Sequence, residues 1–270
     1  MTFSLGPKAL TAGYRLVAFD RIGSTNAEAM SRAREGERGP IWFVTPEQTA
    51  GRGRRQRAWV APRGNLASSV LEVMDVSPGI AATLGFAAGL ALERALQQVS
   101  VEANVRRAGA NPLKYALKWP NDVMAERKKL AGILLEAEAV AGNRLAVVVG
   151  IGTNVVASPT DTPTPATSLA ALGVEVDASE LFTALSEAWV ELHGIWDGAR
   201  GFAEIRKLWL ERAFGLGEAV AIRTGAETIE GTFDTIDDVG CLIVRTLEGT
   251  RKPIAAGEVY FGAAASMGAS

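Results

Sequence analysis

The chain has 270 residues, 48% of them hydrophobic, and its acidic residues outnumber its basic ones by only 30 to 28. This length suits one large domain, or a large domain with a small partner, around a sizeable core. The near-neutral charge excludes an overall attraction to nucleic acid or acidic membranes, and the single cysteine, Cys241, excludes a disulfide framework or a multi-cysteine metal cluster and favours a cytoplasmic location.

The first half of the chain alternates strand-like and helix-like segments. Apolar alternation predicts strands over 14–19, 41–45 and 66–74, and a helix begins near Ser24, with Thr25 and Glu28 spaced as a capping box. Gly51 and Gly53 argue against a helix in the loop before the third strand. A long helix follows over about 80–98. Its uncharged stretch 76–92 is rich in Ala, Gly, Thr and Ser, so a buried helix fits it better than a membrane span.

The second half begins with a polar surface connection over 104–112. Strands are predicted over 115–119, 132–138 and 145–151, the last two joined by a hairpin turn at Gly142-Asn143. Three prolines in 158–168 predict an irregular surface excursion, and amphipathic helices follow over 178–197 and 201–213. Short strands with glycine turns from 218 onward are typical of a small barrel. These segments predict an α+β chain, with a mixed-sheet domain over 1–214 and a small β-barrel domain over 215–270.

The segment GRGRRQR (51–57), here called the arginine loop, concentrates four arginines. Guanidinium groups make charge-assisted, often bidentate hydrogen bonds to phosphate and carboxylate, and glycines let backbone amides approach such anions. The loop therefore suits an anionic small molecule. A solvated basic loop and a nucleic-acid patch are the alternatives.

Three further motifs follow in KWPNDV (118–123), KKLAGIL (128–134) and GIGTNV (150–155). The first places an amide and a carboxylate at the exit of a strand, and the second places a lysine before a small-residue turn that enters a buried strand. The glycines of the third would let a flat ring lie against the backbone, although the spacing is not that of a dinucleotide fold or a P-loop. Taken singly, the first two are better explained as an Asx turn and a surface lysine, and the third equally well as a bend that ends a strand.

Together and in this order, STN (24–26), EQTAGRGRR (47–55), Trp59, KWPNDV, KLAGIL and GIGTNV closely resemble the biotin protein ligases, over about residues 15–261. The resemblance implies a biotin/lipoate-ligase-like catalytic domain and an SH3-like C-terminal domain. It implies biotin and ATP as substrates, Mg²⁺ entering with ATP, a biotinyl-5′-AMP intermediate, and transfer to a lysine of the biotin carboxyl carrier protein of acetyl-CoA carboxylase or a related carboxylase.

The resemblance also bears on partners. Some members carry an N-terminal DNA-binding domain and act as repressors, but only about fourteen residues precede the first predicted strand here. We therefore expect a ligase without repressor activity and with no nucleic-acid or membrane partner. A homodimer is slightly favoured over a monomer.

The resemblance assigns roles residue by residue. The catalytic residues are expected to be the loop-exposed cations that neutralise the biotin carboxylate and the α-phosphate, namely Arg52, Arg54 and Lys129. The biotin site is expected to contain Ser24, Thr25, Asn26, Gln48, Gly51, Arg52, Arg54, Lys129, Gly132 and Leu134. The ATP or adenylate site is expected to contain Arg52, Arg54, Arg55, Trp59, Lys118, Asn121, Lys129, Gly152 and Asn154. Asp122 is expected to orient Mg²⁺ or a neighbouring lysine, and the spacing to AGIL favours Lys129 over Lys128.

One position departs from the family pattern. The family loop usually reads GRGRRGR, and Gln56 replaces its last glycine, so a positive φ there would strain or stiffen the loop. His193 and Cys241 are expected to have packing or surface roles. The alternative functions are a lipoate or octanoate transferase and a non-catalytic biotin or adenylate sensor. A thioester-forming transferase needs a cysteine in the catalytic domain, where Cys241 does not lie.

Overall fold

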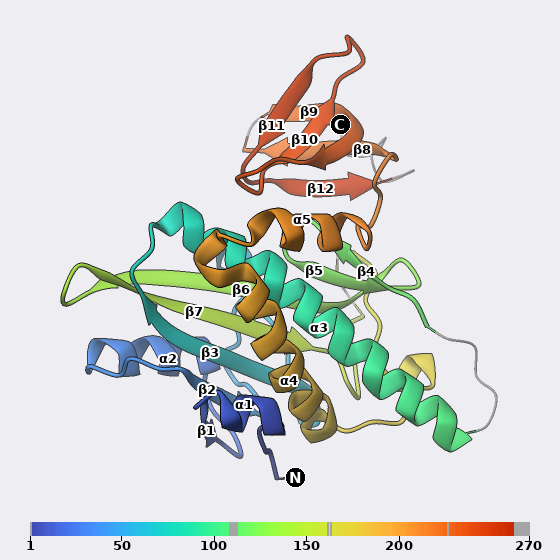
Figure 1. Ribbon diagram of the computed structural model, residues 1–270. Helices are drawn as coiled ribbons and strands as arrows, with labels where there is room; N and C mark the ends of the chain where they lie inside the picture. The colour runs from blue at the N-terminus through green and yellow to red at the C-terminus, as the bar shows by residue number, and fades with distance from the viewer. Residues whose placement is uncertain (1, 108–112, 161, 163, 226, 262–270) are drawn as a thin grey trace.

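Two sheets organise the computed structural model, which describes residues 2–107, 113–160, 162, 164–225 and 227–261 (Figure 1). The larger has seven strands in the order β1-β2-β3-β7-β6-β5-β4, with β1 parallel to β2 and every other neighbouring pair antiparallel. The smaller is antiparallel, with the order β11-β10-β9-β8-β12. The predicted α+β class, with a mixed sheet and a small C-terminal β domain, is confirmed.

The seven-stranded sheet is formed by β1 (Arg15–Ala18), β2 (Ile41–Thr45), β3 (Leu66–Met74), β4 (Tyr115–Lys118), β5 (Asp122–Ala125), β6 (Lys128–Val140) and β7 (Arg144–Thr153). The helices are α1 (Pro7–Thr11), α2 (Thr25–Arg34), α3 (Pro78–Arg107), α4 (Ala178–Trp196) and α5 (Phe202–Leu210). The five-stranded sheet is formed by β8 (Ala219–Thr224), β9 (Glu227–Ile236), β10 (Leu242–Arg245), β11 (Arg251–Ile254) and β12 (Glu258–Phe261).

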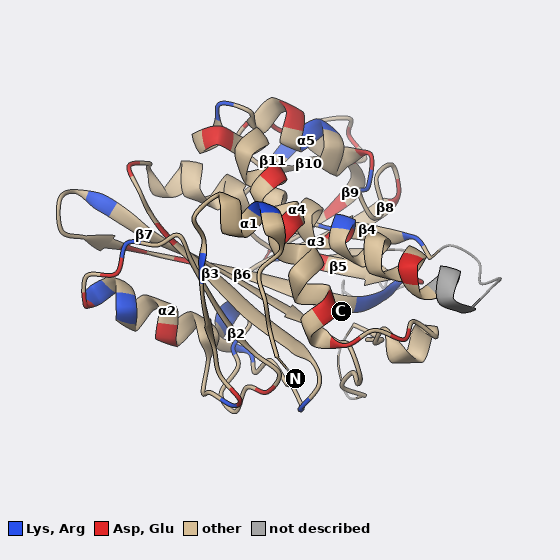
Figure 2. Ribbon diagram, turned by 60° about the horizontal axis from the view of Figure 1, so that its bottom comes forward, with Lys and Arg blue, Asp and Glu red and all other residues tan. Residues whose placement is uncertain are grey.

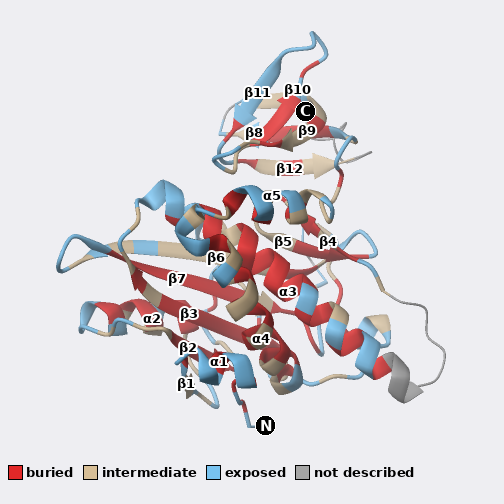
Figure 3. Ribbon diagram, in the orientation of Figure 1, coloured by how far each residue is buried: buried red, intermediate tan, exposed pale blue. Residues whose placement is uncertain are grey.

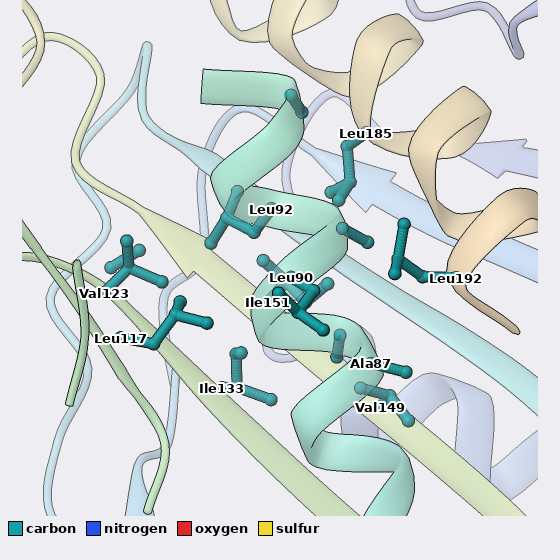
Figure 4. Packing of buried hydrophobic residues seen from close by; sticks show 14 of the residues in the cluster. Ala87, Leu90, Leu92, Leu117, Val123, Ile133, Val149, Ile151, Leu185 and Leu192 are labelled. Carbon is teal, nitrogen blue, oxygen red and sulfur yellow. The ribbon is translucent and has the colours of Figure 1, made fainter. Parts of the chain in front are cut away.

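The main core lies between the large sheet and the helices α3 and α4, while α2 covers the opposite face of the sheet (Figure 1). Ile133 and Ile151 project from β6 and β7 toward Leu90 of α3, and Leu185 and Leu192 of α4 close the layer (Figure 4). Burying one such side chain contributes about 1.5–3 kcal/mol. Figure 3 shows the buried residues concentrated in this layer and in the strands beneath it. The packing of α3 and α4 therefore holds β6 and β7 in place, and the polar motifs KKLAGIL and GIGTNV lie at the ends of these two strands.

Helix α3 has a length and composition that would allow it to cross a membrane over Pro78–Ala103, but 72% of its apolar window is buried inside the protein. The prediction of a buried core helix is confirmed. The helix extends further than predicted, so residues 104–107 belong to it rather than to a surface connection, and residues 108–112 of that connection lie outside the described residues.

Several local predictions differ from the structure. Ser24, not Thr25, is the N-cap of α2, because its hydroxyl accepts the N–H of Ala27. The short elements α1, β5 and β12 were not predicted from the sequence, nor was the single 3-10 turn at Arg54–Gln56 inside the arginine loop. Strand β6 begins at Lys128, four residues before the predicted start, so the turn expected before Gly132 does not exist. The hairpin at Gly142-Asn143 is present, with φ of 84° and 55°.

The small sheet docks against the β4–β5 hairpin of the large one (Figure 1). The indole Nε1 of Trp119, at the end of β4, donates to the carbonyl of Gly240 at 3.1 Å. Arg127, in the turn after β5, pairs with Glu218 at 3.1 Å. The motif KWPNDV, through Trp119, therefore joins the two sheets.

Elsewhere in the fold, basic and acidic residues are interspersed, as α2 and α5 show (Figure 2).

Candidate active site

A cavity of about 400 Å³ opens where α2 begins, where β6 and β7 lie side by side, and where the small sheet meets β4. This volume is in the range of small-molecule sites. The structure brings together at this cavity all but one of the predicted site residues: Ser24, Thr25, Asn26, Gln48, Arg52, Arg54, Arg55, Trp59, Lys118, Asn121, Asp122, Lys129, Gly132, Leu134, Gly152 and Asn154. The exception, Gly51, is buried behind the wall, where an added Cβ would lie 2.5 Å from the carbonyl oxygen of Trp59.

Two glycines form the floor of the cavity. Gly132 and Gly152 are directly paired across β6 and β7, and the indole of Trp59 lies against both of them. A Cβ on Gly152 would lie 2.5 Å from Nε1 of Trp59, and one on Gly132 would lie 3.2 Å from its Cζ3. Any side chain at Gly152 would therefore push the indole away. The glycines of GIGTNV were expected to leave room for the flat ring of a ligand. At Gly152 that space is taken by the indole of the protein's own Trp59.

At one end of the cavity the polar groups are uncharged. Gln48 Oε1 accepts the N–H of Thr25 at 2.8 Å and lies 3.1 Å from the Thr25 hydroxyl oxygen. Asn26 lies over Gly150 of β7, where an added Cβ would come within 2.1 Å of its Oδ1. Hydroxyl and amide groups of this kind bind a neutral ligand that carries both donors and acceptors.

At the other end the groups are mostly cationic. Lys129 Nζ lies 2.6 Å from Asp122 Oδ1, and Arg54 Nη1 donates to Asn121 Oδ1 at 3.4 Å. Burial lowers the pKa values of both Arg54 and Lys118, with neighbouring cations adding to the effect. Arg54, Lys118 and Lys129 thus lie around Asp122, and Glu258 also acts on Arg54 and Lys118. Cations outnumber carboxylates in this partly buried site, which would bind anions.

Lys129 and Arg54 are less exposed than expected. Lys129 is the second residue of β6, with 26% of its side chain exposed, and not a loop residue. Arg54, within the arginine loop, is half-buried and lines the cavity. Both side chains are therefore held in place by the structure around them, and a substitution of either one also removes packing contacts.

The arginine loop divides its cations between different partners. Arg55 and Arg57 both pair with Glu258 of β12, the former at 3.1 Å, and Arg52 Nη2 lies 3.6 Å from Glu136 of β6. Arg54 alone reaches Asn121. Gln56 adopts a φ of 59°, so the strain foreseen for a glutamine in place of glycine is present.

The described residues of the segment 158–168 are irregular and partly exposed, as predicted, but Pro159, Thr162, Thr164 and Ala166 also line the cavity. The amide of Lys129 donates to Pro165 at 2.7 Å, and the amide of Thr167 donates back to Lys129 at 2.9 Å. Asn154 Nδ2 also donates to the carbonyl of Thr167 at 3.0 Å. Among the described residues, Asn154 Oδ1 is buried with no hydrogen-bond partner, so it can accept one from a ligand.

Two parts of the cavity wall were not predicted from the sequence. One comprises residues of the proline-rich segment, and the other is contributed by β12 of the small sheet and the glycine before it: Pro159, Thr162, Thr164, Ala166, Gly257, Glu258, Val259 and Tyr260. Neither segment has a motif or a periodicity that would have indicated a site. Their role depends on contacts with distant parts of the chain.

The described residues contain no group of three or more His, Cys, Asp or Glu side chains that could hold a metal ion. Of the two roles foreseen for Asp122, its contact with Lys129 supports the orientation of a lysine. His193 lies outside the cavity, with its ring tilted against those of Trp189 and Trp196 and its Nε2 3.1 Å from Glu72. Cys241 lies in the small sheet domain, beside Asp237.

Comparison with known proteins identifies families and relatives that this chain resembles. Residues 18–154 match the Biotin/lipoate A/B protein ligase family, and residues 215–262 match the Biotin protein ligase C terminal domain. The biotin–[acetyl-CoA-carboxylase] ligase of Paracoccus denitrificans is 41% identical over 249 residues, which cover 90% of this chain and 98% of that protein. The bifunctional ligase/repressor BirA of Bacillus subtilis is 30% identical, over 92% of this chain and 74% of its own.

Solved structures agree with the sequence comparison. The biotin protein ligase from Aquifex aeolicus in complex with biotin and ATP superposes with a TM-score of 0.72 at 27% identity, covering 92% of this chain and 98% of that one. The biotin protein ligase of Leishmania major in complex with biotinyl-5-AMP gives a TM-score of 0.54 at 26% identity, covering 90% and 98%. The chain belongs to the biotin protein ligase family.

Proposed function

We propose that this protein is an ATP-dependent ligase that activates biotin as biotinyl-5′-AMP and transfers the biotinyl group to a lysine of a biotin carboxyl carrier protein. One observation carries the proposal. The cavity has an uncharged hydroxyl and amide end and a cationic end, and the glycine floor of β6 and β7 connects them. This polarity suits a ligand with a neutral polar head, an apolar chain and a carboxylate.

Biotin would lie along β6. Its ureido ring would meet Ser24, Thr25 and Gln48, and its carboxylate would approach Lys129. Its chain would pass Leu134 and the edge of the Trp59 indole that packs on Gly132. Arg52 and Arg54 complete the proposed biotin site. Gly51 would act only by allowing Gln48 and Trp59 to pack closely, because a Cβ there would lie 2.8 Å from Gln48 Nε2.

ATP would place its α-phosphate beside the biotin carboxylate. One carboxylate oxygen forms a bond to the α-phosphorus as the bond to the bridging oxygen breaks, and pyrophosphate leaves. The two reacting anions repel each other, and Lys129, Lys118 and Arg54 offset that repulsion by charges already in position. Mg²⁺ enters as part of the Mg–ATP substrate. No step is assigned to Asp122 as a metal ligand, because its carboxylate is engaged by Lys129.

The nucleotide would contact the remaining residues of the cavity. Trp59 offers an aromatic face, the unpartnered Asn154 Oδ1 can accept from the exocyclic amine of adenine, and Gly152 keeps the floor flat. Asn121 orients Arg54, and Arg55 adds charge at the mouth. In the second step, the amine of the carrier lysine attacks the acyl carbon, AMP leaves, and an amide bond forms.

Several finer assignments belong to the same proposal. We infer an acetyl-CoA carboxylase or a related carboxylase as the source of the carrier, a cytoplasmic location, and a division into a catalytic domain (1–214) and a C-terminal domain (215–270). Absence of repressor activity and a preference for a homodimer remain predictions. Binding to duplex DNA would be tested by titration at two salt concentrations, and assembly by sedimentation.

The deciding experiment is a mass-spectrometric assay with Mg–ATP, a biotin-carrier domain, and biotin, lipoate or octanoate in parallel. We expect a mass increase on the carrier lysine with biotin alone. A mass increase with lipoate or octanoate instead would show that the protein activates a different acid and would refute the biotin assignment. Biotinyl-AMP that forms but never reaches any carrier would favour the sensor alternative.

A further inference from the structure

Strand β6 contains one residue more than its neighbour β5 can pair. Val123 and Met124 are consecutive in β5, and their partners in β6 are Ala131 and Lys129. Leu130 therefore lies between two paired residues and has no partner in β5, a strand that the structure describes in full. An extra residue of this kind forms a β-bulge, which bends the strand and redirects the side chains beside it. The bulge lies directly next to Lys129.

The bulge interrupts the alternation of side chains along β6. Successive side chains of a strand point to opposite faces, so Gly132 lines the cavity while Ala131 and Ile133 are buried in the main core. Without a bulge, the same alternation would place Leu130 in the cavity and Lys129 in the core. The structure shows the opposite, because Lys129 lines the cavity and Leu130 is fully buried in the core. The extra residue thus moves the lysine to the other face of the sheet.

The pairing with β5 also places Lys129 on the cavity face. Residues directly opposite each other in neighbouring strands share a face of the sheet. Asp122 is paired with Gly132 and Met124 with Lys129, and Asp122 and Met124 lie on one face because they are two residues apart. Lys129 Nζ consequently lies 2.6 Å from Asp122 Oδ1. The lysine side chain passes over Gly132, where an added Cβ would lie 3.4 Å from both its Cε and its Nζ.

The backbone around the bulge is also held on the side away from β5. The amide of Lys129 donates to the carbonyl of Pro165 at 2.7 Å, and its carbonyl accepts the amide of Thr167 at 2.9 Å. The carbonyl of Leu130 accepts the amide of Asn154 at 3.0 Å. The side chains decide which residue takes which face, because an apolar side chain is stabilised by burial in the core and an ammonium is not.

We propose that Leu130 is a positioning residue for adenylate formation, because its burial in the core holds the β-bulge that directs the Lys129 ammonium into the cavity. This inference rests on the proposed function, in which Lys129 faces the biotin carboxylate and the α-phosphate. Leu130 does not line the cavity, so it acts only through Lys129. A displacement of about 1 Å in a group that stabilises a transition state can lower the rate by up to about a hundredfold. The rate therefore depends on how firmly the bulge is held.

The test is a double-mutant cycle on the first-turnover rate of adenylate formation, followed as pyrophosphate release at saturating Mg–ATP and biotin. Leu130→Ala should lower this rate at least fivefold, because the smaller side chain no longer fixes the bulge. In a Lys129→Met background there is no ammonium to misplace, so the same Leu130→Ala change should alter the residual rate less than twofold. Leu130→Met nearly conserves the buried volume and should stay within twofold of the wild-type rate.

The matched control is Leu185→Ala, which removes the same atoms from the same core. Leu185 is fully buried in α4, and none of the residues of that helix, all of them described, lines the cavity. This variant should unfold at a lower urea concentration but keep the rate within twofold of the wild type.

If Leu130→Ala does not fold, Leu130→Val takes its place in the cycle, with the same dependence on Lys129 expected. A smaller loss of rate than fivefold in Leu130→Ala, or an equal loss in the two backgrounds, would refute the positioning role. A wild-type protein that forms no biotinyl-AMP would refute the proposed function itself.

Discussion

Glu258→Gln tests how the small sheet holds the arginine loop. The substitution keeps the shape of the side chain and its capacity to accept from Tyr260, but removes the charge that faces Arg55 and Arg57. Half-exposed ion pairs of this kind contribute roughly 0.2–1 kcal/mol each. The two ion pairs together therefore stabilise the docked loop by about 0.4–2 kcal/mol. Only 19% of the Glu258 side chain is exposed, which limits screening by solvent and favours the upper end of that range.

That free energy sets how often the loop leaves its docked position. A loss of about 0.4–2 kcal/mol increases the open fraction roughly twofold to thirtyfold, while the core of the protein is unaffected. Trypsin cleaves after arginine, so the loop reports its own opening. We expect the initial rate of cleavage within residues 52–57 to rise by that factor in Glu258→Gln, as followed by mass spectrometry at low protease concentration.

The matched control is Glu230→Gln. Glu230 is an exposed residue of β9 in the same small sheet, with no ion pair recorded among the described residues. Its cleavage rate should equal that of the wild-type protein. Equal rates for Glu258→Gln and the wild type would show that the ion pairs do not hold the loop, and the reasoning from the structure would fail.

Three other substitutions have defined outcomes. Lys129→Ala should lower the rate of adenylate formation by about a hundredfold or more in a pyrophosphate-release assay, because one of three charges facing two anions is lost, whereas the exposed Lys128→Ala should not. Gln56→Gly should favour the docked arginine loop by up to about 1 kcal/mol relative to Gln56→Ala, because alanine has a Cβ that is strained at a φ of 59° and glycine has none. Equal rates of trypsin cleavage in the two variants would contradict this expectation. Burial disfavours the charged form of His193, but the neighbouring Glu72 has the larger effect, so the pKa of His193 is raised in the folded protein. The ion pair between His193 and Glu72 therefore stabilises the fold fully below about pH 6.5, the pKa of histidine in the unfolded chain. This stabilisation is lost as the pH rises through the pKa of His193 in the folded protein. The difference in urea unfolding free energy between wild type and His193→Gln should therefore shrink from pH 6 to pH 8.5, and a constant difference would rule out the linkage.

The sequence predicted the elements whose patterns are local. Strands β2 and β3 and helix α4 show clear apolar runs or periodicity, and they appear within one residue of the expected bounds. Strands β5 and β12 have four residues each, and they exist because longer strands lie beside them to pair with. Small residues near Gly132 suggested a turn, yet β6 continues through them because β5 and β7 satisfy its backbone on both sides.

The family resemblance predicted site residues from Ser24 to Asn154. The structure places all of them except Gly51 around one cavity, and their roles remain predictions. The resemblance could not identify Glu258 or Pro165, because an ordinary strand or loop residue has no motif of its own. Their roles follow from tertiary contacts: an ion pair to the arginine loop and a hydrogen bond to Lys129.

The position of Trp59 on the glycine floor gives the protein an optical reporter of its own. The chain has six tryptophans, and the other five, Trp42, Trp119, Trp189, Trp196 and Trp209, are all buried. Iodide would therefore quench mainly the fluorescence of Trp59, and the cations of the arginine loop would concentrate that anion beside it. A ligand that fills the cavity should shield the indole, so quenching by iodide can follow occupancy without labels and without turnover.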